Sequence, residues 1–179
     1  MPPAPPRGLS LVELCATLVV LFGSDHGLCG AFNEQIAAYD QHIRQMAQAD
    51  DRSKRLMGMP GIGPTTASAL LAAIGNGHDF DNGRQVAAWL GLVPGQYSSG
   101  GKSRLGHITK AGDSYLRTLL ILGARAVLAA ANGKQDRISR WAQALAERRG
   151  YWKAVVAIAA KNARMAWAML AKGEAFKPA

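Results

Sequence analysis

A Met-Pro-Gly-Ile-Gly-Pro segment at residues 59–64 constrains the fold most, because it separates two apolar stretches with the composition of helices. Gly61 and Gly63 bracket Ile62, and a glycine permits a positive φ and a close approach of the backbone. The proline that ends the segment suits the first turn of a helix, where its missing N–H costs nothing. The pattern predicts two helices joined by a tight turn over residues 56–75, with the isoleucine as its anchor.

Such a turn is also a candidate anion site. The free N–H groups at the start of the second helix, together with the helix dipole, suit a DNA phosphate. The arrangement resembles a helix-hairpin-helix module, which binds the nucleic-acid backbone and therefore contributes affinity without sequence choice. On this hypothesis Gly61, Ile62 and Gly63 bind nucleic acid. The alternative is a tight turn between two helices that has no ligand.

The charge of the chain is concentrated in its C-terminal half. The formal net charge is +9, and the segment from Ser99 to Met165 holds thirteen Lys and Arg against three acids, a local balance of 13 − 3 = +10. The remainder therefore carries about −1. A solvated basic face is the simple alternative, but the charge adjoins the glycine turn and a glycine-rich loop. This favours a polyanionic partner, nucleic acid before membrane.

That loop is Gly/Ser-rich and basic, and reads Tyr-Ser-Ser-Gly-Gly-Lys-Ser-Arg over residues 97–104. A serine that attacks a phosphodiester must lose its proton, and nearby donors must neutralise the charge of the pentavalent phosphorus. The cations that could do so are Lys102, Arg104, Lys110 and Arg117, and His107 is the nearby imidazole. From these residues alone, a mobile turn or a simple phosphate grip remains the alternative.

The helical periodicity predicts a mainly α fold. We expect five to seven helices in a compact helical domain that carries the helix-hairpin-helix and the basic loop, preceded by a helical arm. Residues 1–30 form a proline-rich start and a short apolar helix, residues 31–50 the arm, and residues 51–173 the domain. Residues 92–112 are expected to be irregular or to carry short strands. The large core side chains are predicted to be Trp89, Leu116, Leu119, Leu120, Trp141 and Trp152.

The arm carries apolar residues in a 4-3-4-3 spacing, at Phe32, Ile36, Tyr39, Ile43 and Met46. This is a heptad stripe of about two heptads, fewer than a firm coiled-coil assignment needs. Pairing with a second copy and packing of a single amphipathic helix on its own domain are equally open.

Cysteine usage and hydropathy argue against some classes of protein. Cys15 and Cys29 are the only cysteines, without a CxxC motif or clustered histidines, so we expect no disulfide framework, no metal site and a reducing cytoplasm. The apolar run Leu9–Phe22 is shorter than the roughly 20 residues that span a bilayer, and Glu13 interrupts it. No membrane association is expected.

Residues 50–171 resemble the C-terminal half of insertion-sequence transposases of the 110/116/902 group, to which pilin-inversion invertases are related. The resemblance rests on MPGIGPTTASALLAAIG and VAAWLGLVPGQYSSGGKSRLGHITKAGDSYLRTLLILGARAVL, in unbroken order. It implies a DNA recombinase in which a serine of the loop attacks DNA and forms a phosphoserine link. Ser99 is the position carried over, with Ser98 as the alternative. A guide RNA is implied as a second nucleic-acid partner.

Members of that group begin with a RuvC-like domain whose four acidic residues bind a divalent metal, and the sequence before the glycine turn shows no such domain. We therefore expect a truncated, split or degenerate transposase that is inactive alone. No cofactor is expected in this chain, and Mg²⁺ is expected only on the missing domain. The expected protein partners are further copies or a full-length transposase, bound through the arm. The alternative is a non-catalytic DNA-binding module or regulator.

Overall fold

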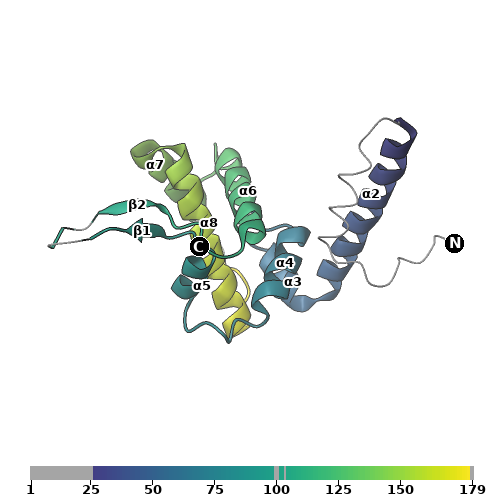
Figure 1. Ribbon diagram of the computed structural model, residues 1–179, viewed down its shortest axis with the longest axis horizontal. Coiled ribbons are helices and arrows are strands. Elements are labelled where there is room, and N and C mark those ends of the chain that lie inside the picture. Colours follow the sequence, from purple (N-terminus) through teal and green to yellow (C-terminus); the bar gives the residue numbers. More distant parts are fainter. Residues whose placement is uncertain (1–25, 99–100, 103, 178–179) are drawn as a thin grey trace. The chain divides into compact units, whose positions relative to one another are not determined.

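The computed structural model describes residues 26–98, 101–102 and 104–177 (Figure 1). The described part is mainly α, as predicted, with seven helices and one two-stranded sheet. In chain order the elements are α2 His26–Ala49, α3 Asp51–Met57, α4 Pro64–Ile74, α5 Gly83–Trp89, β1 Pro94–Gln96, β2 Leu105–Ile108, α6 Ser114–Ala130, α7 Arg137–Arg149 and α8 Tyr151–Lys172. The chain divides into two compact units between His42 and Ile43, and each is described by itself.

Helix α2 forms the arm that the heptad stripe predicts, but it begins at His26, earlier than expected. The predicted proline-rich start and the predicted short apolar helix lie outside the described residues. In the first unit, Ile36 and Tyr39 are 48% and 43% exposed. In the second unit, the last turns of the helix carry the exposed Met46 and the buried Ala47. The stripe is thus helical and largely exposed among the described residues.

Helix α8 is the central helix of the second unit, and α5, α6 and α7 all pack against it (Figure 1). Its buried face is rich in alanine, which lets neighbouring helices approach closely; it consists of Ala154, Val155, Ile158, Ala159, Asn162, Ala163, Ala166, Met169 and Leu170. By length and composition α8 could also cross a membrane, but half of its most apolar window is buried inside the protein. A core helix satisfies the same criterion, and α8 is built as one.

The predicted core is correct in part. Leu116 and Leu120 of α6 are fully buried. Leu119 and Trp141 are half-buried, and Trp141 packs against the core. The prediction was wrong for Trp89 and Trp152, whose side chains are 38% and 65% exposed.

Trp89 and Trp152 are exposed for different physical reasons. Trp89 ends α5 and packs on Phe80, with ring centroids 5.6 Å apart, at the edge of the unit. Trp152 lies in the first turn of α8 on the same helix face as Val156 and Ala160, four and eight residues later. That face borders a surface groove, and only its far end at Ala160 also packs against the core. Apolar periodicity alone does not distinguish these two environments.

The first helix of the glycine turn is fixed by a side-chain cap. Asp50 accepts a hydrogen bond from the backbone N–H of Arg52 at 2.8 Å, at the N-terminus of α3. The side-chain hydrogen bonds from the Arg52 guanidinium lower the pKa of Asp50 to about 2. The same guanidinium also donates to Asn76 Oδ1 at 2.8 Å, just beyond the end of α4. Helices α3 and α4 are therefore held together at the end away from their turn.

Candidate nucleic-acid interface

The glycine turn between α3 and α4 is docked on α6. Gly61 has a φ of +82°, and a Cβ built there would lie 2.6 Å from the carbonyl oxygen of Gly123 in α6. A Cβ on Gly123 would in turn lie 1.9 Å from the carbonyl oxygen of Gly61. The two backbones therefore touch, and both positions require glycine. The close approach that the sequence suggests for a ligand is used here by another helix of the same chain.

Helix α8 holds the same turn from a second direction. Asn162 is 3% exposed and donates from Nδ2 to the Pro60 carbonyl oxygen at 3.0 Å. Ile62 is 5% exposed, which confirms its predicted place as the anchor of the turn. The turn is thus packed against two helices of the second unit, α6 and α8.

Of the three predicted hairpin residues, Gly63 alone is exposed. It caps α4 with a φ of −96° and no side-chain hydrogen bond, and a Cβ there would meet nothing within 4 Å. The accessible part of the turn is therefore the start of α4, where backbone N–H groups have no intrahelical partner. Phosphate binding at this end of α4 stays a prediction.

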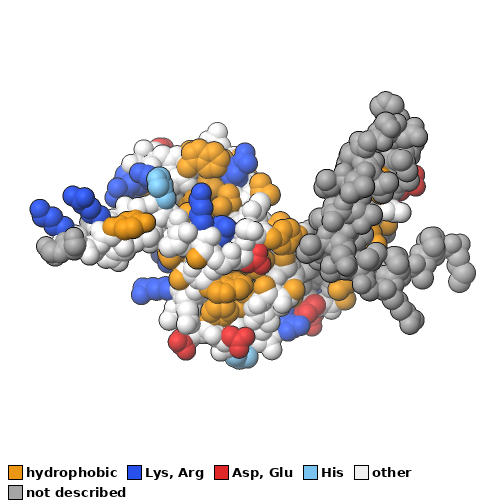
Figure 2. All heavy atoms as spheres, viewed as in Figure 1, with side chains coloured by type: hydrophobic (Ala, Val, Ile, Leu, Met, Phe, Trp, Pro, Cys, Tyr) orange, Lys and Arg blue, Asp and Glu red, His pale blue; other side chains and the backbone are white. Residues whose placement is uncertain are grey.

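Two antiparallel strands flank the predicted basic loop and form a hairpin. Strands β1 and β2 pair antiparallel, with Pro94 opposite Ile108 and Gln96 opposite Leu105, and Tyr97 N–H donates to the Arg104 carbonyl oxygen at 2.8 Å. The hairpin projects from the helices of the second unit on the side away from α3 and α4 (Figure 1). Lys and Arg side chains gather at this projecting end (Figure 2). The glycine turn and the basic loop therefore lie at different places in the second unit.

The tip of the hairpin brings a serine and two cations together. Ser98, Lys102 and Arg104 line one hollow of about 470 Å³ with Tyr97. The Ser98 hydroxyl accepts a hydrogen bond from Gln96 Nε2 at 2.8 Å. The predicted nucleophile Ser99 lies outside the described residues. Among the described ones, the tip contains the alternative nucleophile and two of the four predicted cations.

The other predicted cations, Lys110 and Arg117, lie at the base of the hairpin. Arg117 Nη1 donates to the carbonyl oxygens of Leu90 at 3.1 Å and Ala111 at 2.9 Å. Lys110 adopts a φ of +55°, and its backbone N–H donates to the Gly91 carbonyl oxygen at 3.2 Å. The guanidinium of Arg117 therefore joins the end of α5 to the segment that leaves β2.

We expect Arg117→Met to lower the free energy of unfolding by about 1–3 kcal/mol, since two carbonyl oxygens would lose a charged donor. Arg140→Met is the matched control, because Arg140 is an exposed cation of α7. Thermal unfolding of both variants measures the effect. Equal midpoints would contradict the structural role of Arg117.

The positive charge of the second unit has little internal compensation. The ion pairs among the described residues, Arg52–Asp50 and Lys54–Asp51, both lie at α3. Lys161 stands 4.2 Å above the Trp141 ring, and burial together with the nearby Arg137 and Arg164 lowers the pKa of its ammonium group. A cluster of like charges of this kind attracts a polyanion.

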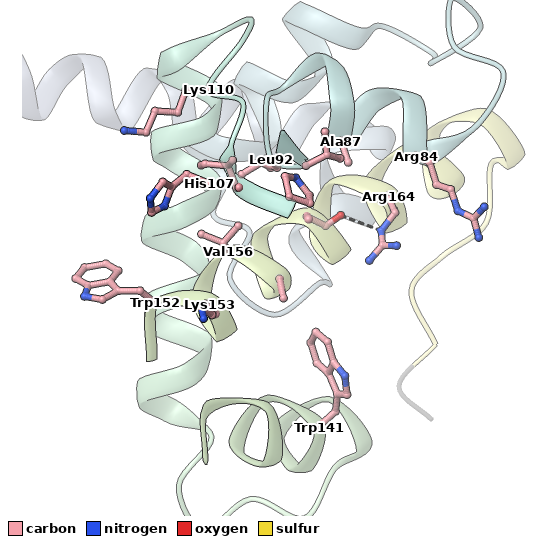
Figure 3. Close-up of a pocket in the computed structure, with 16 residues that line it drawn as sticks. Arg84, Ala87, Leu92, His107, Lys110, Trp141, Trp152, Lys153, Val156 and Arg164 are labelled. Carbon is pink, nitrogen blue, oxygen red and sulfur yellow. Dashed lines mark hydrogen bonds between the residues drawn. The ribbon is translucent and has the colours of Figure 1, made fainter. Parts of the chain in front are cut away.

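Sequence reasoning missed a groove of about 900 Å³ between the hairpin base and α8 (Figure 3). His107 lines this groove and not the hollow at the tip, so the structure does not place the predicted imidazole beside Ser98. The missed residues are Arg84, Trp141, Trp152, Lys153 and Arg164. A sequence signal did exist: positions 153, 157, 160 and 164 share one helix face, with a cation at each end.

A divalent metal does not fit the described residues. None of their His, Cys, Asp and Glu side chains gather in a group of three that could hold an ion. We therefore assign no metal-dependent step to this part of the chain.

Comparison with known proteins identifies the family. Residues 53–140 match the family model described as Transposase IS116/IS110/IS902 family. The chain is 49% identical over 144 residues to a "Probable family 20 transposase" of Pseudomonas aeruginosa, which covers 80% of this chain and 43% of that protein. It is 43% identical over 145 residues to the "Transposase for insertion sequence element IS1111A" of Coxiella burnetii, over 81% of this chain and 40% of that protein.

A third relative, the "Transposase for insertion sequence element IS1328" of Yersinia enterocolitica, is 34% identical over 96% of this chain and 54% of its own length. The chain belongs to the IS116/IS110/IS902 transposase family. It spans about two fifths to one half of the length of these curated relatives.

Proposed function

We propose that the chain acts in DNA transposition, as the part of an insertion-sequence transposase that grips DNA and contributes a serine nucleophile. The observation that carries this proposal is the tip of the β-hairpin, where Ser98, Lys102 and Arg104 line one hollow. Supporting it are the uncompensated positive charge of the second unit and the names of the relatives. On this proposal the substrate is DNA, and the chain works in the cytoplasm.

In the proposed reaction the hydroxyl oxygen of Ser99, or alternatively of Ser98, attacks a DNA phosphorus atom. The Oγ–P bond forms as the bond from phosphorus to the deoxyribose oxygen breaks, and the leaving oxygen takes up a proton. The phosphodiester is conserved as a phosphoserine link, so no energy-rich cofactor is needed. Lys102 and Arg104 stabilise the negative charge of the pentavalent phosphorus.

The remaining predicted contacts hold the DNA in place. The start of α4 at Gly63 binds a backbone phosphate, with Gly61 and Ile62 shaping the turn behind it. Lys110 and Arg117 add positive charge near the hairpin base, and a guide RNA is a second polyanion that this surface suits. Each of these contacts recognises backbone and not sequence.

We expect Lys102→Gln with Arg104→Gln to weaken duplex DNA binding and to reduce the salt dependence. Each lost phosphate contact removes about 0.9 from the slope of log affinity against log salt concentration, so the double variant should lose nearly 2. Fluorescence anisotropy with a labelled duplex between about 50 and 200 mM salt measures this. Lys54→Gln is the control, since Lys54 pairs with Asp51 on α3. An unchanged slope in the double variant would contradict DNA binding at the tip.

We also propose that the arm joins two copies, or this chain and a full-length transposase. The exposed Ile36 and Tyr39 on α2 support this, because they belong to the heptad stripe. Replacing Ile36 and Ile43 by Asp should convert an oligomer into a monomer in sedimentation or light scattering. Gln35→Asp with His42→Asp, at exposed positions outside the stripe, is the control. A monomeric wild-type chain would refute the pairing of two copies, and a full-length transposase that does not bind the wild-type chain would refute the other assembly.

A non-catalytic DNA-binding module or regulator is the second candidate. It is favoured by the exposed start of α4 at Gly63, which suits a phosphate contact and takes no part in a reaction. It predicts salt-sensitive DNA binding that Ser99→Ala leaves unchanged, and no covalent product under any condition.

A further inference from the structure

The groove between the hairpin base and α8 differs chemically from both predicted DNA contacts. Its charged residues are all cations, namely Arg84, Lys110, Lys153 and Arg164, with His107 beside them. Its floor is apolar and is formed by Leu92, Ile108, Val156, Ala157 and Ala160. Figure 3 shows Lys110, His107, Trp152 and Lys153 along one part of the groove, and Arg84 and Arg164 at another. A ligand that fits is both anionic and rich in flat apolar surface.

Two tryptophans supply aromatic surface to this groove. Trp152 lines the groove and is 65% exposed. Tyr151 meets its ring edge-on, with centroids 5.2 Å apart and an interplanar angle of 82°, and the Arg125 guanidinium lies 5.9 Å from its centroid. Trp141 lines the groove from α7, with Lys161 above its ring. Each indole therefore has a cation beside it.

We propose that this groove binds unpaired nucleotides, with a base stacked on Trp152 and the phosphates held by Lys153, Arg164 and the cations opposite. Stacking on an aromatic ring together with a cationic track is how proteins hold single strands without reading their sequence. A duplex presents phosphates outward and keeps its bases paired, so it would leave the apolar floor and the indoles unused. A cationic groove also disfavours a basic or neutral peptide. The proposal rests on the proposed function and adds to it a second site, which binds single strands and not duplexes.

The groove lies beside the hairpin that carries the serine tip. Strand β2 contributes Gly106, His107 and Ile108 to the groove, and the same hairpin carries Lys102 and Arg104 at its tip. A strand that is unpaired in the groove therefore leaves it near the proposed reaction site. On this proposal the base of the hairpin helps to bind the single strand, and its tip carries the reacting serine.

Binding of a labelled twenty-nucleotide oligo(dT), its oligo(U) counterpart and a duplex of the same length tests the proposal. For Trp152→Ala we expect about tenfold weaker binding of a single strand, the effect of one lost stacked base, with duplex binding unchanged. Trp152→Phe, which keeps an aromatic face, should restore most of the affinity. Tyr115→Ala is the control, because Tyr115 is a 57% exposed aromatic of α6 outside the groove. Lys153→Gln with Arg164→Gln should reduce the salt slope for single strands by about 0.7 per contact.

A loss with oligo(dT) alone assigns the groove to DNA, a loss with oligo(U) alone assigns it to RNA, and a loss with both assigns it to either strand. Unchanged single-strand affinity in Trp152→Ala, or an equal loss for duplex, would overturn the proposal. The proposal would also be overturned if the wild-type chain bound no single strand and formed an oligomer that Trp152→Glu converts into monomers. The groove would then be a protein–protein interface. Failure of the proposed function shows separately, as duplex binding that does not respond to Lys102→Gln with Arg104→Gln.

Discussion

Replacing Gly123 by alanine is expected to lower the unfolding midpoint of the protein by about 4–8 °C, a loss of roughly 2 kcal/mol. In an ordinary helix the same change would be stabilising by about 1 kcal/mol, because alanine is the better helix former. Here a Cβ on Gly123 would lie 1.9 Å from the Gly61 carbonyl oxygen. Real Cβ atoms essentially never come closer than 3.0 Å, so the backbones must separate by about 3.0 − 1.9 = 1.1 Å.

That separation has a cost that exceeds the helix-propensity gain. The contact is between two backbones, so no side chain can rotate away, and overpacking of this kind typically costs 1–3 kcal/mol or more. The hydrogen bond from Asn162 to Pro60 holds the turn from the other side and resists the shift. The sign of the change therefore reports whether the glycine turn is docked on α6.

The matched control is Gly63→Ala in the same turn. A Cβ there meets nothing within 4 Å, and the φ of −96° suits alanine. The loss should stay below about 1 kcal/mol, the usual range for a capping position. Differential scanning calorimetry of the two variants is sufficient. A raised midpoint for Gly123→Ala would show that the turn and α6 are not in contact.

Much of the fold follows from local sequence signals. Asn82, Asp113 and Asp136 each accept a hydrogen bond from the first turn of the helix that follows, at 2.8–3.1 Å, so these starts can be read from single residues. The strands at residues 94–96 and 105–108 fall within the segment predicted to be irregular or to carry short strands. Contacts between distant segments could not be read this way. Nothing local indicates that Gly123 faces Gly61.

The sequence predicts which residues belong to the candidate site, but it does not predict which of them lie close together. In sequence, Ser98, Lys102, His107 and Arg117 lie within twenty residues and suggest one site. In the structure the paired strands extend the segment, so Ser98 and Lys102 lie at the tip while His107 and Arg117 lie at the base. The sequence does not reveal the groove, because an aromatic side chain such as Trp152 is expected in the core. Whether an exposed helix face carries a hollow depends on what packs beside it.

Ser99→Ala is expected to abolish the covalent link between this protein and DNA while leaving DNA binding unchanged. Loss of an enzymic nucleophile lowers the rate by at least about a thousandfold, because no neighbouring group replaces the missing oxygen. On the proposed function, DNA is bound through phosphate contacts from Lys102 and Arg104, which the substitution does not touch. The readout is a protein–DNA adduct that survives denaturing electrophoresis, formed on labelled DNA carrying an insertion-sequence end. The reaction is run with and without a RuvC-like partner domain and Mg²⁺.

Ser98→Ala is the matched control, because it removes the adjacent hydroxyl from the same tip. If Ser98→Ala forms the adduct and Ser99→Ala does not, Ser99 is the nucleophile; the reverse result assigns the reaction to Ser98. An adduct that persists in both variants would exclude a serine of this dipeptide. Binding without an adduct in the wild-type chain, with the partner domain present, would instead favour the non-catalytic module. The hollow lined by Ser98, Lys102 and Arg104 would then be a phosphate grip, and its cations would affect affinity alone.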